Sequence, residues 1–440
     1  MFSWEYMGGL LLVGWRTSCV HGLPREDQVP EGSTGLAEGA QFAAGGRTSD
    51  RIRNLLIPSP SFERAPGPRV RTRHPRATPG QEHAPSFPAA APPGRLGRMT
   101  VDALTDVAGL RVGHATRRGE GWLTGTTVVL APPGGAVAAV DVRGGGPGTK
   151  ETDALDPRNL VRTVEAVVLT GGSAYGLDAA SGVMAWLEEQ GRGIRVGPRP
   201  GEVVPVVPAA CVFDLGRGGD FRARPDAATG RQAVEAAAAS EPGGRIAQGC
   251  VGAGTGAVVG SVKGGVGTAS TVLASGVTVA ALVVANAAGS AVDPATGVLY
   301  GEVLQGRVEY PAPRVHQAAR RRLAEVAAHR TTPPLNTTLA VVATDAALSK
   351  AQAQKLAGTA HDGIARAVRP VHLLNDGDTV FALATGARPL DAERPLVLND
   401  VLAAGADTVT RAIVNAVRAA ESVDGPGGVW PAYEELYGPR

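Results

Sequence analysis

The sequence predicts a four-layer α/β fold, αββα, in which two buried β-sheets carry helices on their outer faces. Two observations predict it. Apolar, β-prone segments recur through the second part of the chain and are separated by glycine-rich turns, and segments with helical spacing of apolar residues alternate with them. Two sheets covered by helices use these parts economically. A three-layer α/β fold fits the same pattern, so the pattern alone leaves it open.

Several segments have the composition expected of strands. They are rich in valine, alanine, threonine or leucine, and turn-forming residues separate them. The predicted strands span residues 126–130, 136–142, 164–170, 209–215, 277–285, 339–344 and 379–384.

Other segments have apolar residues at helical spacing, namely 177–189, 313–328, 351–368 and 398–417. The first ends at Gly191, and the third begins after Ser349, a good N-cap residue. The last is the clearest, because its apolar residues share one face, and Gly425-Pro426 is expected to stop it.

Residues 1–98 differ from the rest of the chain. They are rich in arginine, proline and glycine and have almost no apolar periodicity, so they are expected to be a disordered leader. Globular patterning begins at Met99, which makes Met99 a candidate for the true start. We expect one domain over residues 99–440, and no functional residue is predicted before Met99.

Composition excludes several classes of partner. The 440 residues carry a net charge of +2 and only 4% aromatic residues, so a nucleic-acid partner is not predicted. Glycine and polar residues interrupt the apolar stretch 271–292, so no membrane span is expected. Cys19, Cys211 and Cys250 are too scattered for a disulfide framework or a metal site, which fits a reducing, cytoplasmic setting.

Thr337 is a candidate nucleophile. Asn336-Thr337-Thr338 opens a predicted strand, and a threonine hydroxyl is a weak nucleophile at its ordinary pKa. Cleavage of the preceding peptide bond would free an α-amine, with a pKa of about 7.7–8.0, to serve as its base. Taken alone, the tripeptide also fits a simple strand entry or a glycosylation sequon.

Lys263 and the turn Asp376-Gly377-Asp378 are the charged candidates. Lys263 lies in an apolar, glycine-rich region, where it must reach solvent or pair with a buried acid such as Asp376 or Asp378. Two carboxylates flanking one glycine enter a dry pocket only beside a cation, which Lys263 and the Thr337 amine would supply. The alternative is that both aspartates cap a solvated turn.

Two further segments offer hydrogen-bond donors. Asn286 ends an apolar run, where its amide could stabilise an oxyanion or simply form a turn. Residues 171–176 lie between a predicted strand and a predicted helix, so their backbone N–H groups could line a pocket or form a plain turn. The eight histidines show no spacing that suggests a triad or a zinc site, which favours a nucleophile that supplies its own base.

Residues 263–268 resemble a phosphate-binding loop. However, Gly267 stands directly before Thr268, where such a loop needs a lysine. The glycines are expected instead to allow close backbone approach or a bulge between strands. A nucleotide-binding protein is kept as a remote alternative.

The order of these segments, from about Thr105 to the C-terminal helix, resembles the N-terminal-nucleophile hydrolase family of L-aminopeptidase D-amidase/esterases, β-aminopeptidases and nylon-oligomer hydrolases. The resemblance implies an αββα fold, self-cleavage between Asn336 and Thr337, and homo-oligomers of the two-chain unit, with a tetramer favoured. It rests on residues 171–177, 252–256, 263–265, 283–286, 336–338 and 376–378.

Threonine after asparagine and the Asp-Gly-Asp turn are most similar to the nylon-oligomer (6-aminohexanoate-oligomer) hydrolases. The resemblance then makes Thr337 the nucleophile and, through its freed amine, the base. It also implies that Lys263 and Asn286 line the site and that Asp376 and Asp378 orient Thr337.

Substrate contacts are expected from Gly172, Tyr175 and Phe213, and Phe213 stands where the nylon hydrolases have a tyrosine. The implied function is self-processing hydrolysis of linear 6-aminohexanoate oligomers or related small amides, with no cofactor or metal. An aminopeptidase or β-aminopeptidase acting on short peptides is the alternative.

Overall fold

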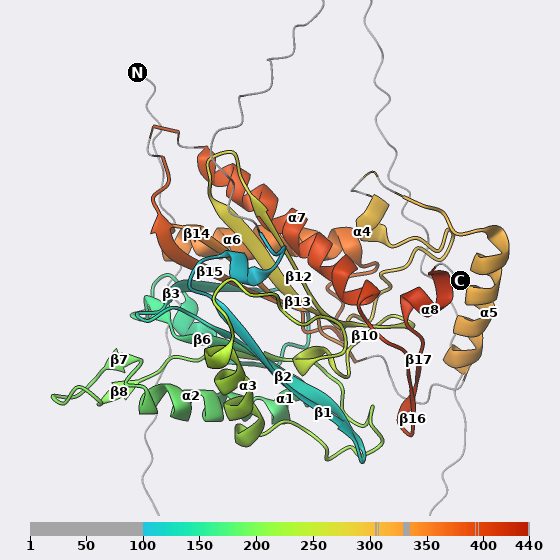
Figure 1. Ribbon diagram of the computed structural model, residues 1–440, viewed down its shortest axis with the longest axis horizontal. Helices are drawn as coiled ribbons and strands as arrows, with labels where there is room; N and C mark the ends of the chain where they lie inside the picture. Colours follow the sequence, from blue (N-terminus) through green and yellow to red (C-terminus); the bar gives the residue numbers. More distant parts are fainter. Residues whose placement is uncertain are drawn as a thin grey trace, which may run out of the picture. The chain divides into compact units, whose positions relative to one another are not determined.

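The computed structural model describes residues 100–303, 306, 308–328, 335–391, 393–394 and 396–438. The leader predicted for residues 1–98 lies outside the described residues. Two β-sheets occupy the centre of the described chain, with helices on either side (Figure 1).

Among the described residues, the first sheet has five strands. β1 and β2 form an antiparallel hairpin, β6 pairs antiparallel with β2, and β9 runs parallel to β6. In spatial order the strands are β1 (Arg111–Gly119), β2 (Trp122–Leu130), β6 (Ala166–Thr170), β9 (Ala209–Cys211) and β4 (Thr149–Lys150).

The second sheet has six strands in the part of the chain that the structure describes. Its centre is a parallel pair, β14 and β15, flanked by antiparallel neighbours. In spatial order the strands are β12 (Gly265–Val272), β13 (Thr278–Ala285), β14 (Leu339–Ala346), β15 (Thr379–Arg388), β3 (Ala136–Val142) and β5 (Thr163–Val164).

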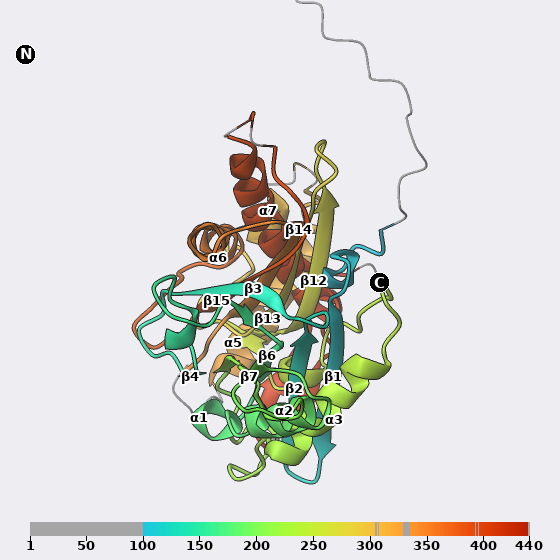
Figure 2. The same cartoon turned by 90° about the vertical axis from the view of Figure 1, so that its left-hand side faces the viewer.

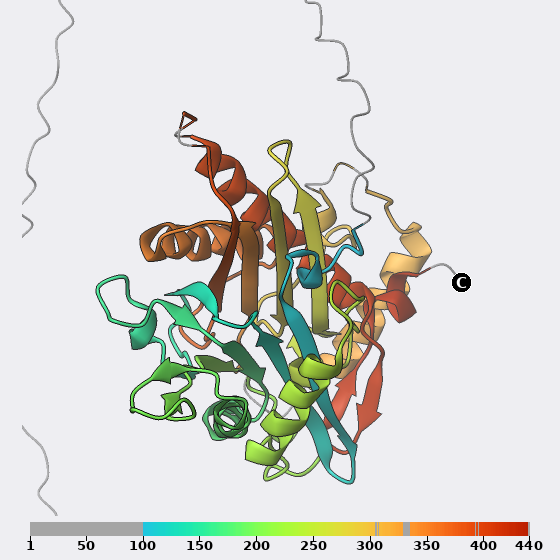
Figure 3. The ribbon, with the colours of Figure 1, turned by 60° about the vertical axis from the view of Figure 1, so that its left-hand side comes forward.

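Helices cover the outer face of each sheet. α6 (Lys350–Ala367) and α7 (Val397–Arg418) pack on the six-stranded sheet, and α2 (Ala179–Glu189) and α3 (Ala227–Ala239) pack on the five-stranded sheet (Figure 2). Figure 3 shows the same separation, with the green helices on one side of the sheets and the orange and red helices on the other. Further helices are α1 (Ser173–Gly176), α4 (Tyr300–Val303), α5 (Pro313–Ala328) and α8 (Tyr433–Tyr437).

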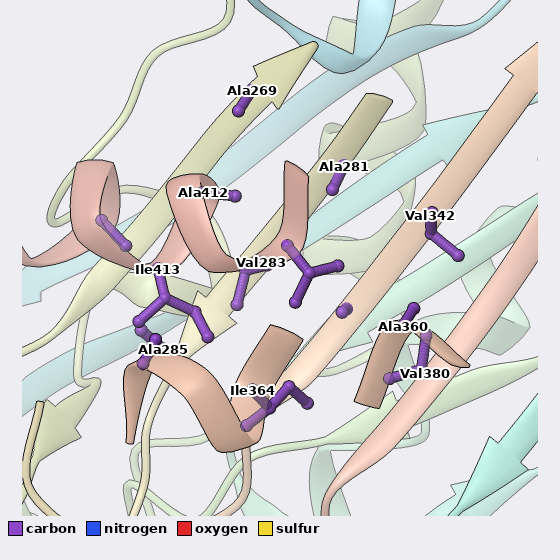
Figure 4. Packing of buried hydrophobic residues seen from close by; sticks show 14 of the residues in the cluster. Ala269, Ala281, Val283, Ala285, Val342, Ala360, Ile364, Val380, Ala412 and Ile413 are labelled. Carbon is purple, nitrogen blue, oxygen red and sulfur yellow. The ribbon is translucent and has the colours of Figure 1, made fainter. Parts of the chain in front are cut away.

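Burial along β13 demonstrates the four layers. Val279, Ala281 and Val283 belong to the cluster shared with α6 and α7, whereas Ala280, Leu282 and Val284 belong to the cluster between the sheets. Because side chains alternate along a strand, both faces of this strand are covered. Figure 4 shows the outer cluster, where Ile364 and Ile413 pack over the strands. The predicted αββα fold is confirmed.

Some elements differ from the predicted segments. The expected strand over residues 209–215 stops at Cys211, because the chain then leaves the sheet and Val212 O accepts a hydrogen bond from Ser173 N at 3.0 Å. The strands β1 and β12 and the helix α3 lie outside the segments predicted from the sequence.

The predicted stop of the last helix is wrong. α7 ends at Arg418, and Gly425-Pro426 instead lies at the turn between β16 (Val423–Gly425) and β17 (Gly428–Trp430). The short hairpin explains the glycine and proline, which favour turns as well as helix ends.

Most of the glycine-rich segment that resembles a phosphate loop lies in β12. Residues 265–268 pair with β13, and Thr268 Oγ1 donates to Ala281 O at 2.8 Å. Gly267 permits close packing on α7, because a Cβ there would lie 2.0 Å from Ala412 O. The segment is therefore a paired strand and does not form a phosphate loop.

None of the helices in the described ranges has the length and apolarity needed to span a bilayer.

Candidate active site

The segments just before β14 and β15 bring Asn336, Thr337, Asp376 and Asp378 together. These strands are parallel and start side by side, with Leu339 opposite Thr379. Just before them, Asn336 and Asp376 form a parallel bridge, and Asn286 follows the end of the neighbouring antiparallel strand β13. Segments far apart in sequence therefore meet at the end of the six-stranded sheet where its two central strands begin.

Thr337 is buried, with 5% of its surface exposed. Its amide nitrogen donates to Asn286 O at 2.6 Å, and its Oγ1 donates to Asn336 O at 2.6 Å. The hydroxyl thus lies against the carbonyl of the peptide bond that precedes it. Gly377 packs against this hydroxyl, because a Cβ at Gly377 would lie 2.6 Å from Thr337 Oγ1.

Asp378 connects the backbone after Thr337 to a histidine. Its Oδ1 accepts from Thr338 N at 2.7 Å, and its Oδ2 lies 2.8 Å from His372 Nδ1. Asp378 is buried, so it does not cap a solvated turn.

Asp376 is buried beside it. Its carboxylate accepts from Ala288 N at 3.1 Å and from Leu373 N at 3.3 Å. Burial, and then the nearby Asp378 carboxylate, raise the pKa of Asp376 above its usual range. Both aspartates therefore face the interior, as the interpretation of a dry site required.

Asn286 is fully buried and its amide has a defined orientation. Its Oδ1 accepts from Arg217 Nη1 at 2.6 Å and from Val258 N at 3.0 Å. Because both partners are donors, the oxygen must face them, and the NH₂ group points the other way. The Nδ2 atom lies 3.5 Å from Phe213 O.

Lys263, in β11 (Val262–Lys263), is fully buried, but its partners are not the expected carboxylates. Its ammonium donates to three backbone carbonyls, those of Gly254 at 3.2 Å, Ala257 at 2.7 Å and Gly264 at 2.9 Å. Burial lowers the pKa of Lys263 to about 8. Backbone carbonyl groups thus take the place of the buried acid that was expected to pair with Lys263.

Arg217 is a site residue that the sequence analysis missed. It donates to Gly256 O at 2.7 Å and to Asn286 Oδ1, and its Nη2 donates to Asn336 Oδ1 at 2.8 Å. One guanidinium therefore joins the residue before Thr337 to the candidate oxyanion donor. Arg217 follows Phe213 closely in the sequence, and this proximity was the only signal that pointed to it.

A histidine pair also escaped the sequence analysis. His372 contacts Asp378, and the rings of His361 and His372 lie 4.9 Å apart in an edge-to-face arrangement. His361 Nε2 lies 3.0 Å from Asp141 O. Burial lowers the pKa of His361 to about 4, so its neutral form is favoured near neutral pH.

The three residues expected to contact substrate do not cluster as the residues around Thr337 do. Phe213 borders the site through its backbone oxygen, and Gly172 N donates to Asp214 Oδ1 at 2.6 Å. Tyr175 is 57% exposed, and the Arg224 guanidinium lies 3.8 Å from the centre of its ring. None of the hydrogen bonds found among the described residues joins Tyr175 to Thr337, and the three substrate roles stay predictions.

Residues 102–430 match peptidase family S58. The chain belongs to this family. The predicted relation to N-terminal-nucleophile hydrolases is thus confirmed, and this S58 peptidase is a hydrolase that acts on amide or peptide bonds.

Relatives of the S58 chain carry two kinds of name. It is 48% identical over 352 residues to a Mycobacterium tuberculosis protein named as an uncharacterized aminopeptidase, covering 77% of this chain and 98% of that protein. It is 32% identical over 294 residues to the 6-aminohexanoate-oligomer endohydrolase of a Kocuria species, covering 64% of this chain and 74% of the endohydrolase.

Solved structures share its fold. A Burkholderia β-aminopeptidase has a TM-score of 0.57 and 26% identity, covering 79% of this chain and 97% of that one. The L-aminopeptidase D-Ala-esterase/amidase of Ochrobactrum anthropi, described as a variant of the Ntn hydrolase fold, has a TM-score of 0.56 and 24% identity, covering 78% and 95%.

Proposed function

We propose that this S58 peptidase cuts itself between Asn336 and Thr337 and then uses Thr337 as an N-terminal nucleophile to hydrolyse short amides. One observation supports this most directly: the buried Thr337 hydroxyl lies 2.6 Å from the oxygen of the carbonyl it would attack. Because the hydroxyl and the carbonyl belong to adjacent residues, the attack is intramolecular and needs no bimolecular encounter. Residues 99–440 would then be one domain made of two chains.

The self-cleavage has only the chain and one water molecule as reactants, so it requires no cofactor. Thr337 Oγ1 attacks the Asn336 carbonyl carbon, its proton passes to the departing Thr337 nitrogen, and the acyl group moves from nitrogen to oxygen. Water then hydrolyses the ester. The products are a chain ending at the Asn336 carboxylate and a chain beginning with the Thr337 amine.

In turnover, the Thr337 amine serves as the base. It takes the proton from Oγ1 during attack on the substrate carbonyl and returns it to the leaving nitrogen. Water hydrolyses the resulting ester. Asn286 supplies an oriented NH₂ group for the oxyanion, because Arg217 and Val258 hold its oxygen.

The charged residues take positioning roles in this proposal. Lys263 binds the carbonyls of Gly254 and Ala257 and so holds the loop whose Val258 N contacts Asn286. Asp378 fixes Thr338 N, and the Asp376 backbone bridges to Asn336. The expected homo-oligomer and the cytoplasmic location stay predictions.

Intact mass and denaturing gels of the purified wild type, Thr337→Ala and Thr338→Ala test the proposal. Thr338 is a matched control, since it is also buried and its hydroxyl has no partner among the described residues. We expect two fragments with Thr337 as a new N-terminus in the wild type and in Thr338→Ala, and one uncut chain in Thr337→Ala. An uncut wild type would exclude self-processing.

For the substrate we propose linear 6-aminohexanoate oligomers or similar small amides, as the Asn-Thr-Thr and Asp-Gly-Asp segments suggest. Short peptides are the second candidate, favoured by the 48% identity to a protein named as an aminopeptidase. Products from oligomers and peptides with free and blocked amino groups distinguish the two. Cleavage of only the free-amine forms indicates an aminopeptidase, whereas cleavage of blocked oligomers indicates an endohydrolase.

A further inference from the structure

We propose that Arg217 binds the acyl residue of the substrate in the mature enzyme. Among short peptides, the second substrate candidate, the site therefore prefers acyl residues with an amide or carboxylate on the γ-carbon. Asparagine and aspartate are such residues. The inference rests on the proposed function, because it requires Thr337 to be the nucleophile both in self-cleavage and in turnover.

The chain's own peptide bond reveals where an acyl group lies. In both reactions Thr337 Oγ1 must bond to a carbonyl carbon, and that carbon must occupy one position relative to the same oxyanion donors. In self-cleavage the acyl residue is Asn336. After Asn336 departs, the acyl residue of a substrate takes the place that Asn336 held.

The contacts around Asn336 are specific for an acceptor on the γ-carbon. Arg217 Nη2 donates to Asn336 Oδ1 at 2.8 Å, and Asn336 Nδ2 lies 3.5 Å from Val258 O. Asn336 is buried, so its side chain meets protein groups rather than bulk water. The first contact has a charged donor and is the stronger of the two.

Arg217 is held in place independently of Asn336. Its Nη1 donates both to Gly256 O and to Asn286 Oδ1, at 2.7 and 2.6 Å. A planar guanidinium fixed by two acceptors keeps the direction of its remaining N–H groups, so the subsite is oriented before substrate arrives. An amide or carboxylate oxygen of the substrate can accept a hydrogen bond from this donor, whereas an aliphatic side chain of the same size cannot.

The test uses the processed wild type with the para-nitroanilides of asparagine, aspartate and leucine, because leucine matches asparagine in size. We expect kcat/KM to be at least about tenfold higher for asparagine than for leucine, the loss typical of one bond to a charged group. In Arg217→Met the ratio should fall toward one. Arg222→Met, an exposed arginine of the same loop, should keep the wild-type ratio.

A second measurement does not depend on whether Arg217→Met folds or processes. We expect self-cleavage of Asn336→Leu to be at least about tenfold slower than that of the wild type, and Asn336→Asp to be slowed less, since a carboxylate retains the bond to Arg217. Equal rates for Asn336→Leu and the wild type would overturn the inference.

The outcomes separate this inference from the function on which it rests. A wild type that stays uncut overturns both. A wild type that is cut at Thr337 but hydrolyses the leucine compound as fast as the asparagine compound, or hydrolyses neither, overturns the subsite alone.

Discussion

Asp378 Oδ2 lies 2.8 Å from His372 Nδ1, while Asp378 Oδ1 accepts from Thr338 N at 2.7 Å. A histidine from the loop after α6 is thus connected through one carboxylate to the backbone beside the proposed nucleophile. His372 adopts a left-handed backbone with φ of 56°, which is uncommon for a residue with a side chain. His372 N also donates to Asp378 Oδ2 at 3.2 Å, so both the backbone and the ring of His372 contact this carboxylate, which supports a role in orienting Asp378.

We predict that His372→Asn slows self-cleavage by roughly tenfold to a hundredfold, because Asp378 loses a hydrogen bond worth about 1.5–3 kcal/mol. Asparagine tolerates a left-handed backbone, so the change removes the ring without adding strain. The half-time of fragment appearance on a gel measures the effect. His316→Asn, which removes a ring that contacts Tyr437, is the control, and a His372→Asn half-time equal to this control would contradict the prediction.

The short-range spacing of apolar residues was enough to predict several helices and strands. α5 spans the predicted residues, and β14 and β15 begin where their apolar runs begin. β12 was not predicted as a strand, although its glycines were expected to permit close backbone approach or a bulge, and Gly267 does lie against α7. That helix is more than a hundred residues away, so the sequence gives no local sign of which element approaches.

Some residues of the candidate site could likewise be predicted from the sequence, and others could not. Thr337, Asn286 and Asp378 are polar residues at the ends of apolar runs, so their positions are unusual within the sequence itself. Arg217 and His372 lie in loops, where charged and polar residues are ordinary, and only the folded chain brings them to the site. Lys263 was noticed, but its carbonyl partners depend on how the chain between Gly254 and Gly264 folds back.

Gly377→Ala should abolish or greatly slow self-cleavage. The new methyl group would lie 2.6 Å from Thr337 Oγ1 and 2.8 Å from Gly146 O, closer than van der Waals contact permits, so the hydroxyl must move. Small displacements of a reacting group can cost about a hundredfold in rate. Fragment yield measured by intact mass tests this, and Gly201→Ala, whose Cβ meets nothing within 4 Å, should process normally. Normal processing of Gly377→Ala would disprove the close contact.

Lys263 should make stability rise with pH in the alkaline range. Burial lowers its pKa from 10.5 to about 8, so between these values the unfolded chain binds more protons than the folded chain. The free energy of unfolding therefore increases from about pH 8 to about pH 10.5, by about 3 kcal/mol for this group, and the gain is absent below pH 8.

Urea unfolding at several pH values tests this linkage, with Thr337→Ala as the parent so that the chain stays uncut. Adding Lys263→Met should remove the alkaline rise, whereas adding Lys355→Met, at an exposed lysine, should leave it unchanged. Parallel pH curves for the parent and the Lys263→Met variant would show that the buried ammonium contributes no such linkage.

Gly182 should be essential for the close contact between α2 and α3. A Cβ at Gly182 would lie 1.8 Å from Ala227 O, and a Cβ at Gly230 would lie 1.8 Å from Ala179 O, so the two helices touch through their backbones. Gly182→Ala forces them apart and should destabilise the chain by about 1–3 kcal/mol, as is usual for overpacking. Ser181→Ala, on the exposed side of α2, is the control for helix propensity. Urea midpoints in the Thr337→Ala background measure both variants, and an unchanged midpoint for Gly182→Ala would mean that the helices do not approach this closely.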